Sequence, residues 1–164
     1  MADKKITDLT DLTAVADDDY LEIVDTSANT SKKIKRETLA GWHFLTAPLT
    51  STAWDGDSFS TTAKTKIDLS AVFGVPAGVR AVLVQLLARD SGSAASTSIF
   101  FGVSPNDADA SNPVMAVGRG LPNDTMVYAN GICPCDANGD IYYQVVASGS
   151  GTMDCWIRIW GYWL

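Results

Sequence analysis

The sequence predicts an all-β protein, with a small N-terminal β-hairpin arm and a C-terminal β-sandwich that is jelly-roll-like or of a related topology. Short runs with apolar residues at every second position recur along the chain, and clusters of Gly, Ser, Asn and Asp separate them at regular intervals. After residue 57, no stretch has the pattern of a persuasive amphipathic helix. Periodicity alone does not choose among the sandwich topologies.

The composition limits the classes of function. A formal net charge of −7 argues against nucleic-acid binding, which usually requires a basic surface. No apolar run approaches the roughly 20 residues that span a bilayer, so no membrane partner is predicted. The polar start "MADKKITDLT" lacks the apolar segment of a Sec signal peptide. Three cysteines are an odd number, which favours free thiols in a reducing cytoplasm over a disulfide framework.

Differences in composition divide the chain into three predicted parts. The first part carries most of the charge, including Asp17–Asp19 and the basic run "KKIKR". The stretch "HFLTAPLTSTAWDGD" has no clean period and contains Pro48, as a linker would. The remainder is rich in Gly, Ser, Thr, Val and aromatic residues. The predicted parts are an N-terminal module at residues 1–41, a linker at 42–56 and a β-sandwich domain at 57–164.

Two short strands are predicted in the N-terminal module. "YLEIVDT" (20–26) alternates in polarity, and "SANTS" follows it with turn-forming residues. "KKIKRETLAGW" then predicts a second strand that runs into a brief helix, which Gly41 would end. Because a single hairpin of this size is only marginally stable, the module is expected to need a neighbour.

The sandwich strands begin at "TAKTKIDL", where Thr65, Ile67 and Leu69 share one side and predict a half-buried strand. "VRAVLVQLLARD" (79–90) is apolar on both faces, so both faces are expected to be covered. Asn138-Gly139 predicts a tight hairpin turn. The other predicted strands are "TSIFFGV", "VMAVGR", "TMVYANGI", "IYYQVVA" and "MDCWIRIWGYWL".

Catalytic chemistry is not predicted, and we expect the protein not to be an enzyme. The single histidine, His43, stands between Trp42 and Phe44, and any Ser-His-Asp or Cys-His arrangement would have to use it. A histidine in such a setting is interpreted as a bystander. No glycine loop has the strand-to-helix context of a phosphate site, and no carboxylate pair suited to sugar hydrolysis stands out.

Two weak metal motifs were weighed against structural alternatives. Cys133, Cys135 and Cys155 with His43 lack the paired spacing of zinc sites, so buried thiols are favoured. "DANGD" (136–140) resembles the start of a calcium loop but lacks the acidic residue at the twelfth position, and a hairpin turn explains it better. A bound cation at this turn stays a minor alternative, and no metal or cofactor is predicted.

The terminal stretch "TMDCWIRIWGYWL" raises the question of what covers its aromatic side chains. Strand alternation places Cys155, Ile157 and Ile159 on one face. The opposite face is open to three interpretations: a core under a second sheet, a platform that stacks on sugars, or a subunit interface, where Trp, Tyr and Arg are enriched. The candidate interface residues are Trp156, Arg158, Trp160, Tyr162, Leu83 and Leu87.

The N-terminal module carries a recognisable motif order. An Ile-Thr-Asp-Leu opening is followed by an acidic turn, a "LEIVD" strand, a Ser/Thr/Asn turn and a "SKKI" strand that leads to a leucine. This order resembles a module at the start of many tailed-bacteriophage virion proteins, including tail fibres, head fibres and capsid-decorating proteins. The pieces are Ile6–Leu9, Asp17–Asp19, Leu21–Asp25, Ser31–Ile34 and Leu39, within about a quarter of the chain.

The resemblance implies an attachment module that carries a separate β-rich domain, commonly in trimers. Because the sequence shows no long shaft or repeat, the resemblance favours a homotrimeric capsid cement or decoration protein that clamps neighbouring capsid subunits. Its partner would be the major capsid protein, and it would be assembled in the host cytoplasm and lie on the capsid surface. The implied attachment residues are Ile6, Leu9, Leu21, Ile23, Lys32, Lys33 and Ile34.

The alternative is a short tail-fibre or head-fibre protein, joined to tail or portal proteins, that binds a host surface glycan. The loops "SPNDADASNP" and "GLPND" would then carry recognition. An enzyme such as a depolymerase is a third class, but no residues can be named as its acid and nucleophile.

Overall fold

The chain divides into two compact units, residues 1–40 and 41–164, which are described separately. The computed structural model confirms the all-β class, with antiparallel strands in both units. The described residues are 20–25, 30–35, 41–54, 63–94, 99–108, 113–117 and 123–164.

The N-terminal unit contains the predicted hairpin. Strands β1 (Tyr20–Asp25) and β2 (Thr30–Lys35) pair antiparallel along their whole length. β1 matches the predicted run 20–26 to within one residue, whereas β2 begins at Thr30, inside the predicted turn "SANTS". The brief helix predicted after the second strand lies outside the described residues.

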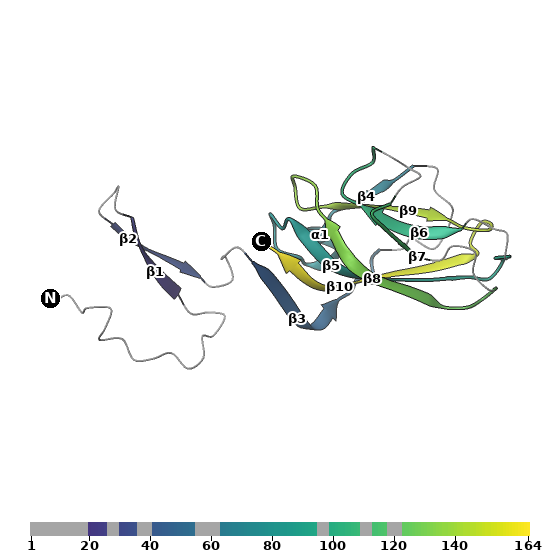
Figure 1. Cartoon of the computed structure of the whole chain (residues 1–164), viewed down its shortest axis with the longest axis horizontal. Helices are drawn as coiled ribbons and strands as arrows, with labels where there is room; N and C mark the ends of the chain where they lie inside the picture. The colour runs from purple at the N-terminus through teal and green to yellow at the C-terminus, as the bar shows by residue number, and fades with distance from the viewer. Residues whose placement is uncertain are drawn as a thin grey trace. The chain divides into compact units, whose positions relative to one another are not determined.

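The C-terminal unit consists of two four-stranded antiparallel sheets, which are labelled by strand in Figure 1. Strands that follow one another in sequence mostly belong to opposite sheets, so the chain crosses repeatedly between the layers. The first sheet has the order β3 (Trp42–Leu49), β10 (Met153–Trp163), β5 (Ala81–Asp90) and β8 (Val127–Pro134). The second has the order β4 (Thr65–Ile67), β9 (Ile141–Val146), β6 (Phe100–Ser104) and β7 (Met115–Val117).

The core lies between the two sheets and is built by alternation along the strands. In β5, every second residue is fully buried, from Val82 to Ala88. Phe101 of β6 is also fully buried, and Trp54 stacks on it with ring centroids 5.8 Å apart. Each such side chain contributes about 1.5–3 kcal/mol by leaving water. Other members of this cluster are Val103, Ile141, Val145, Met153, Cys155, Ile157 and Ile159.

A short helix, α1 (Leu69–Phe73), corrects the predicted strand "TAKTKIDL". The Asp68 carboxylate accepts a hydrogen bond of 2.9 Å from the N–H of Ala71, and Gly74 ends the helix in the left-handed conformation at φ 72°. Aspartate is a strong N-cap, and glycine is the favoured residue at a helix end. The caps therefore override the alternating pattern, and the strand ends at Ile67.

The predicted linker, residues 42–56, is also corrected, because strand β3 occupies its first half. Trp42 pairs with Trp163 of β10, and Gly41 and Leu164 exchange two backbone hydrogen bonds of 3.2 Å. The strand escaped prediction because its burial pattern is irregular and it contains Pro48, which an edge strand tolerates. The C-terminal unit therefore begins at Gly41.

Candidate functional site

The surface of the β3–β10–β5–β8 sheet that points away from the core is the candidate site, and it is called the outer face below. Register partners in neighbouring strands share a face, so their side chains form rows across the sheet. The rows across β10, β5 and β8 are Trp156–Leu87–Tyr128 and Arg158–Gln85–Asn130, followed by Leu83–Ile132 and by Trp163–Ala81–Pro134.

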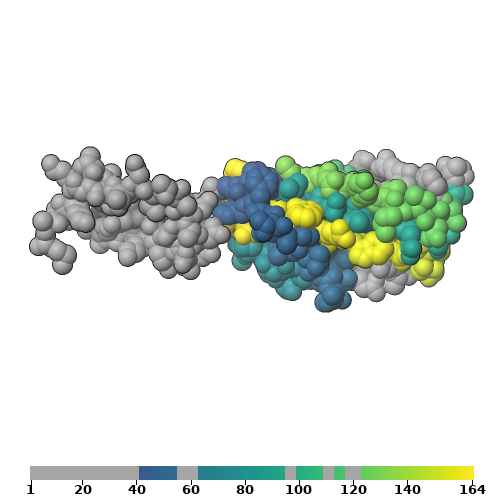
Figure 2. Space-filling model, turned by 90° about the horizontal axis from the view of Figure 1, so that it is seen from below, coloured from purple at the N-terminus to yellow at the C-terminus, as the bar shows by residue number. Residues whose placement is uncertain are grey.

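Most of the exposed large hydrophobic side chains of the described residues lie on the outer face. Among the described residues, six large hydrophobic side chains are exposed, and four of them lie here: Phe44 (72%), Tyr128 (68%), Ile132 (52%) and Trp156 (38%). At about 200 Å² per side chain, these four alone expose roughly 500 Å². The largest apolar patch on a typical monomeric protein is about 300–600 Å², and such a patch is often functional. In Figure 2 the yellow atoms of β10 are visible between the blue atoms of β3 and the green atoms of β8.

A β-bulge in β10 changes which aromatic residues reach this face. Ile159 pairs with Val84 and Gly161 with Leu83, so Trp160 is the extra residue. Strict alternation predicted Tyr162 on the outer face, and this is wrong: its register partner is the fully buried Val82, and Tyr162 packs against the core. Its ring also stacks on His43 of β3, with ring centroids 5.2 Å apart.

Gly161 is required at the bulge because β3 approaches it closely. A Cβ atom at this position would lie 2.8 Å from the carbonyl oxygen of His43, closer than real Cβ contacts. The bulge also moves Trp163 to the outer side, where Trp42 meets it edge-on at 5.7 Å. Trp42 in turn stacks on Phe44 at 6.0 Å, which extends the aromatic surface to the edge strand.

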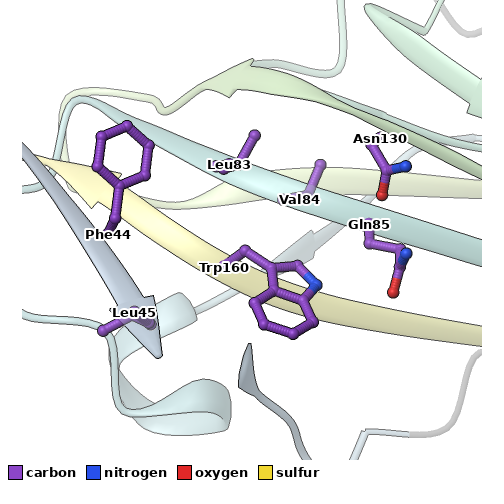
Figure 3. Close-up of a pocket in the computed structure, with 7 residues that line it drawn as sticks. All are labelled: Phe44, Leu45, Leu83, Val84, Gln85, Asn130 and Trp160. Carbon is purple, nitrogen blue, oxygen red and sulfur yellow. The ribbon is translucent and has the colours of Figure 1, made fainter. Parts of the chain in front are cut away.

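A hollow of about 410 Å³ opens on this face, and Figure 3 draws the residues that line it. Aromatic rings of Phe44 and Trp160 stand on one side, and the amides of Gln85 and Asn130 stand on the other. A mixture of apolar walls and a few polar groups is typical of surfaces that receive a side chain or a small ligand. The remaining lining residues are Leu45, Leu83 and Val84.

Charge is sparse on the outer face. Arg158 donates a long hydrogen bond of 3.4 Å to the Gln85 side-chain oxygen, and no carboxylate of the described residues lies within ion-pair distance of it. At one end of the face, Arg89 Nε lies 3.0 Å from an Asp154 carboxylate oxygen and 3.5 Å from one of Asp124. These contacts raise the pKa of Arg89, chiefly through its hydrogen bond with Asp154.

The "DANGD" turn is held by protein groups. Asp136 accepts hydrogen bonds of 2.8 and 2.9 Å from the N–H groups of Asn138 and Asp140, which confirms a tight turn. The predicted hairpin is wrong, because the turn joins β8 and β9 of opposite sheets. Lys66 Nζ lies 2.6 Å from an Asp140 oxygen and 3.9 Å from an Asp136 oxygen, and the hydrogen bond to Asp140 raises the pKa of Lys66. An ammonium group therefore stands where the calcium-loop resemblance would place a cation.

Cys155 lies far from Cys133. Cys133 pairs with Val82 and Cys155 with Ala88, six residues apart on β5, which corresponds to about 20 Å. In the part of the chain that the structure describes, no group of His, Cys, Asp and Glu is arranged to hold a metal. Burial raises the pKa of the Cys133 and Cys135 thiols to about 12, which keeps them protonated and unreactive at neutral pH.

The predicted site residues thus divide into several groups. Trp156, Arg158, Trp160, Leu83 and Leu87 lie together on the outer face, and Tyr162 does not. Sequence reasoning missed Phe44, Tyr128 and Ile132, although the two in "TMVYANGI" alternate with period two and could have been found. In the hairpin, Leu21 pairs with Ile34, Ile23 with Lys32, and Lys33 with Glu22, whereas Ile6 and Leu9 lie outside the described residues.

No family model matches this sequence, and no curated protein matches it significantly. Among the described residues, no helix is long and apolar enough to cross a membrane. The functional argument therefore rests on the chain's own residues.

Proposed function

We propose that this chain is a structural protein of a tailed-bacteriophage virion: a capsid cement or decoration protein that clamps neighbouring capsid subunits as a homotrimer. The observation that carries the proposal is the bare apolar outer face, which fits burial between copies. The motif order of the N-terminal module adds independent support, since its two expected strands coincide with β1 and β2.

The strand order supports assigning the C-terminal unit to the jelly-roll class. Counted from β3 as the first of eight strands, the two sheets run 1-8-3-6 and 2-7-4-5, which is the arrangement of two interlocked Greek keys. Domains of this kind occur in viral capsids and in lectins. The fold is therefore compatible with attachment to a particle and with glycan binding. The choice between these two functions depends on the residues at the surface and not on the fold.

The proposed mechanism has two steps. Burial of the outer face between copies supplies the association energy, because each large side chain removed from water is worth about 1.5–3 kcal/mol. Three joined copies then present three N-terminal modules to the capsid. Linked attachment points raise overall affinity by about 10²–10⁴ when the geometry allows all of them to engage. A trimer of individually weak contacts would thus tie several capsid subunits together.

Binding to capsids that lack this protein tests the proposal. The full chain is compared with a chain that starts at Gly41, the first residue of the C-terminal unit, so that the hydrogen bonds between Gly41 and Leu164 are kept. The full chain is expected to co-sediment with capsids, and the truncated chain is expected to stay in the supernatant while its C-terminal unit still unfolds cooperatively. Capsid decoration by the truncated chain would contradict the role of the module.

The hollow on the outer face favours one second candidate, a short fibre protein that binds a host glycan. Aromatic rings beside amide groups form a suitable sugar platform, and Trp160 and Gln85 lie on this surface. Glycan-array binding that disappears in Trp160→Ala, with no binding to capsids, would favour this candidate. No glycan binding together with a smaller assembly in Trp160→Ala would favour the subunit interface.

A further inference from the structure

We propose that the hollow on the outer face binds one uncharged pyranose unit of a glycan, with Trp160 stacked on the sugar ring and the amides of Gln85 and Asn130 bonded to its hydroxyls. This inference rests on the second candidate function and names the ligand class of its site. It also sets a limit on the homotrimer, because a copy that covers the outer face closes the hollow and competes with the sugar.

The hollow has an apolar wall that suits the ring of a sugar. A pyranose carries C–H groups on the two faces of its ring and hydroxyl groups around its rim. The β-bulge of β10 presents the partly exposed ring of Trp160, and Phe44 of edge strand β3 is 72% exposed beside the same hollow. Because the face of an aromatic ring is apolar and electron-rich, it accepts C–H groups in preference to hydroxyls. The volume of about 410 Å³ lies within the range of roughly 300–1,000 Å³ that is usual for ligand pockets.

Strand register builds the polar wall. Gln85 of β5 and Asn130 of β8 are register partners, so their side chains are neighbours on the outer face. Arg158 Nη1 donates to Gln85 Oε1 at 3.4 Å, which leaves the Gln85 Nε2 group to donate elsewhere. Asn130 is exposed and carries both a donor and an acceptor. The two amides therefore offer adjacent donors and acceptors to neighbouring hydroxyls of one sugar, and Arg158 is a positioning residue for the first of them.

The charge of the hollow selects an uncharged sugar. None of the seven residues that line it is charged. The guanidinium of Arg158 lies in the polar row beside the hollow and is directed at Gln85 Oε1. The chain as a whole carries a net charge of −7, which disfavours the approach of an anion. A carboxylate or sulfate group on the sugar would therefore meet no cation among the lining side chains.

Saturation-transfer NMR of the full chain at low concentration tests the inference. The probes are trisaccharides of glucose, galactose and mannose, with trigalacturonate as the acidic probe. At least one neutral probe is expected to bind, and to bind more tightly than trigalacturonate. Trp160→Ala is expected to weaken this binding by about 10-fold or more. Trp156→Ala is the matched control, because Trp156 lies on the same strand and face but outside the hollow. Equal losses in the two variants, or tighter binding of the acidic probe, would overturn the inference.

A second variant tests the amide wall without removing an aromatic ring. Gln85→Glu keeps the size of the side chain, removes its N–H donors and places a carboxylate beside Arg158. The neutral probe is expected to bind about 10-fold more weakly to this variant. Unchanged affinity would contradict the role of the Gln85 amide.

Sedimentation of the full chain, with and without the tightest neutral probe, separates this inference from the homotrimer. The probe is expected to shift the trimer towards single chains, because it binds only where the hollow is open. A trimer whose dilute chain binds no neutral probe would overturn the saccharide site and leave the homotrimer standing. A single chain at every concentration that binds a neutral probe would overturn the homotrimer and support the saccharide site. A trimer that binds the probe and stays intact would contradict burial of this face between copies.

Discussion

The outer faces of the two sheets differ in how far their side chains are exposed to water. On the β4–β9–β6–β7 sheet, three outward residues are buried, since Ser104 is 1% exposed, Gln144 5% and Phe100 9%, although Lys66 and Tyr142 on the same face are not buried. Pro113 lies so close to Gly102 that a Cβ there would come within 2.6 Å of it. On the other sheet, Phe44 and the β8 side chains stand open.

This difference shows that the bare face is a specific feature of the molecule. Part of the second sheet's outer face is thus covered down to a few per cent exposure, whereas the rings of Phe44 and Tyr128 on the other sheet stay in contact with water. Ser104 Oγ and Gln144 Oε1 are buried on the covered face and have no hydrogen-bond partner among the described residues, which is unfavourable for a buried polar atom. The bare face is therefore best explained by contact with another molecule.

The largest expected effect is in the core between the sheets, which can be compared directly with the outer face of the first sheet. Phe101→Ala removes a fully buried ring that stacks on Trp54, and it is expected to lower the free energy of unfolding by about 3–5 kcal/mol. Tyr128→Ala on the outer face is expected to leave the unfolding of the separated chain nearly unchanged and to weaken assembly. Urea denaturation at several protein concentrations separates the two effects. Similar losses at low concentration would show that both faces serve the core.

A smaller loss of stability is expected at Asp90, whose hydrogen bonds connect β5 to the turn between β9 and β10. Asp90, at the end of β5, accepts hydrogen bonds from the hydroxyls of Ser148 (2.5 Å) and Thr152 (3.2 Å), which lie in the turn between β9 and β10. It also accepts from the N–H groups of Ser148 and Gly92. Asp90→Asn turns an amide group towards these donors and is expected to cost about 2 kcal/mol at pH 7 in urea denaturation.

The pH dependence of stability sharpens this prediction. Burial would raise the pKa of Asp90, but the four donated hydrogen bonds outweigh it and hold the pKa below its ordinary value. Its stabilising contribution is therefore complete above the unfolded pKa of about 3.9 and is lost as the pH falls through the lower folded value. The difference between the parent chain and Asp90→Asn should shrink between pH 5 and pH 2. A constant difference would refute this role.

The next smaller loss of stability is expected at the β-bulge of β10, which places Trp160 beside the hollow. Gly161→Ala brings a methyl group against the His43 carbonyl, and it is expected to lower the free energy of unfolding by about 1–2 kcal/mol. Because the bulge positions Trp160, assembly is expected to weaken more than stability does. Thermal unfolding and sedimentation measure the two quantities, and an Ala variant that assembles like the parent would show that the bulge does not position the interface.

The smallest effect is expected at the charged end of the outer face. Arg89 is exposed and pairs with Asp154 and Asp124, and exposed ion pairs contribute little to stability. Arg89→Gln is expected to leave the denaturation midpoint unchanged within error. A clear loss of assembly in this variant would extend the interface beyond the rows described above.

Much of the fold could be predicted from local patterns. Alternation located β1, β5, β9 and β10, and Asn138-Gly139 located a turn, because these signals act over a few residues. Strand β3 was missed because an edge strand with Pro48 owes its conformation to pairing with β10, which no local pattern records. Helix α1 was missed because the Asp68 cap, rather than periodicity, sets it.

The candidate site was predicted in part for the same reason. Alternation correctly grouped Trp156 and Arg158 with Leu83 and Leu87. It failed at Tyr162, because the extra residue at Trp160 reverses the alternation and only the paired strands reveal the bulge. Phe44, Tyr128 and Ile132 joined the site through sheet order, which brings β3 and β8 beside β10 and β5. The role of this surface as an interface stays a prediction.

The central claim is that copies of this chain hide the outer face from water by joining, and sedimentation equilibrium of the full chain at micromolar concentration tests it most directly. The account predicts a species of three times the 17.5 kDa chain mass. A single species of 17.5 kDa, unchanged as the concentration rises, would contradict the account.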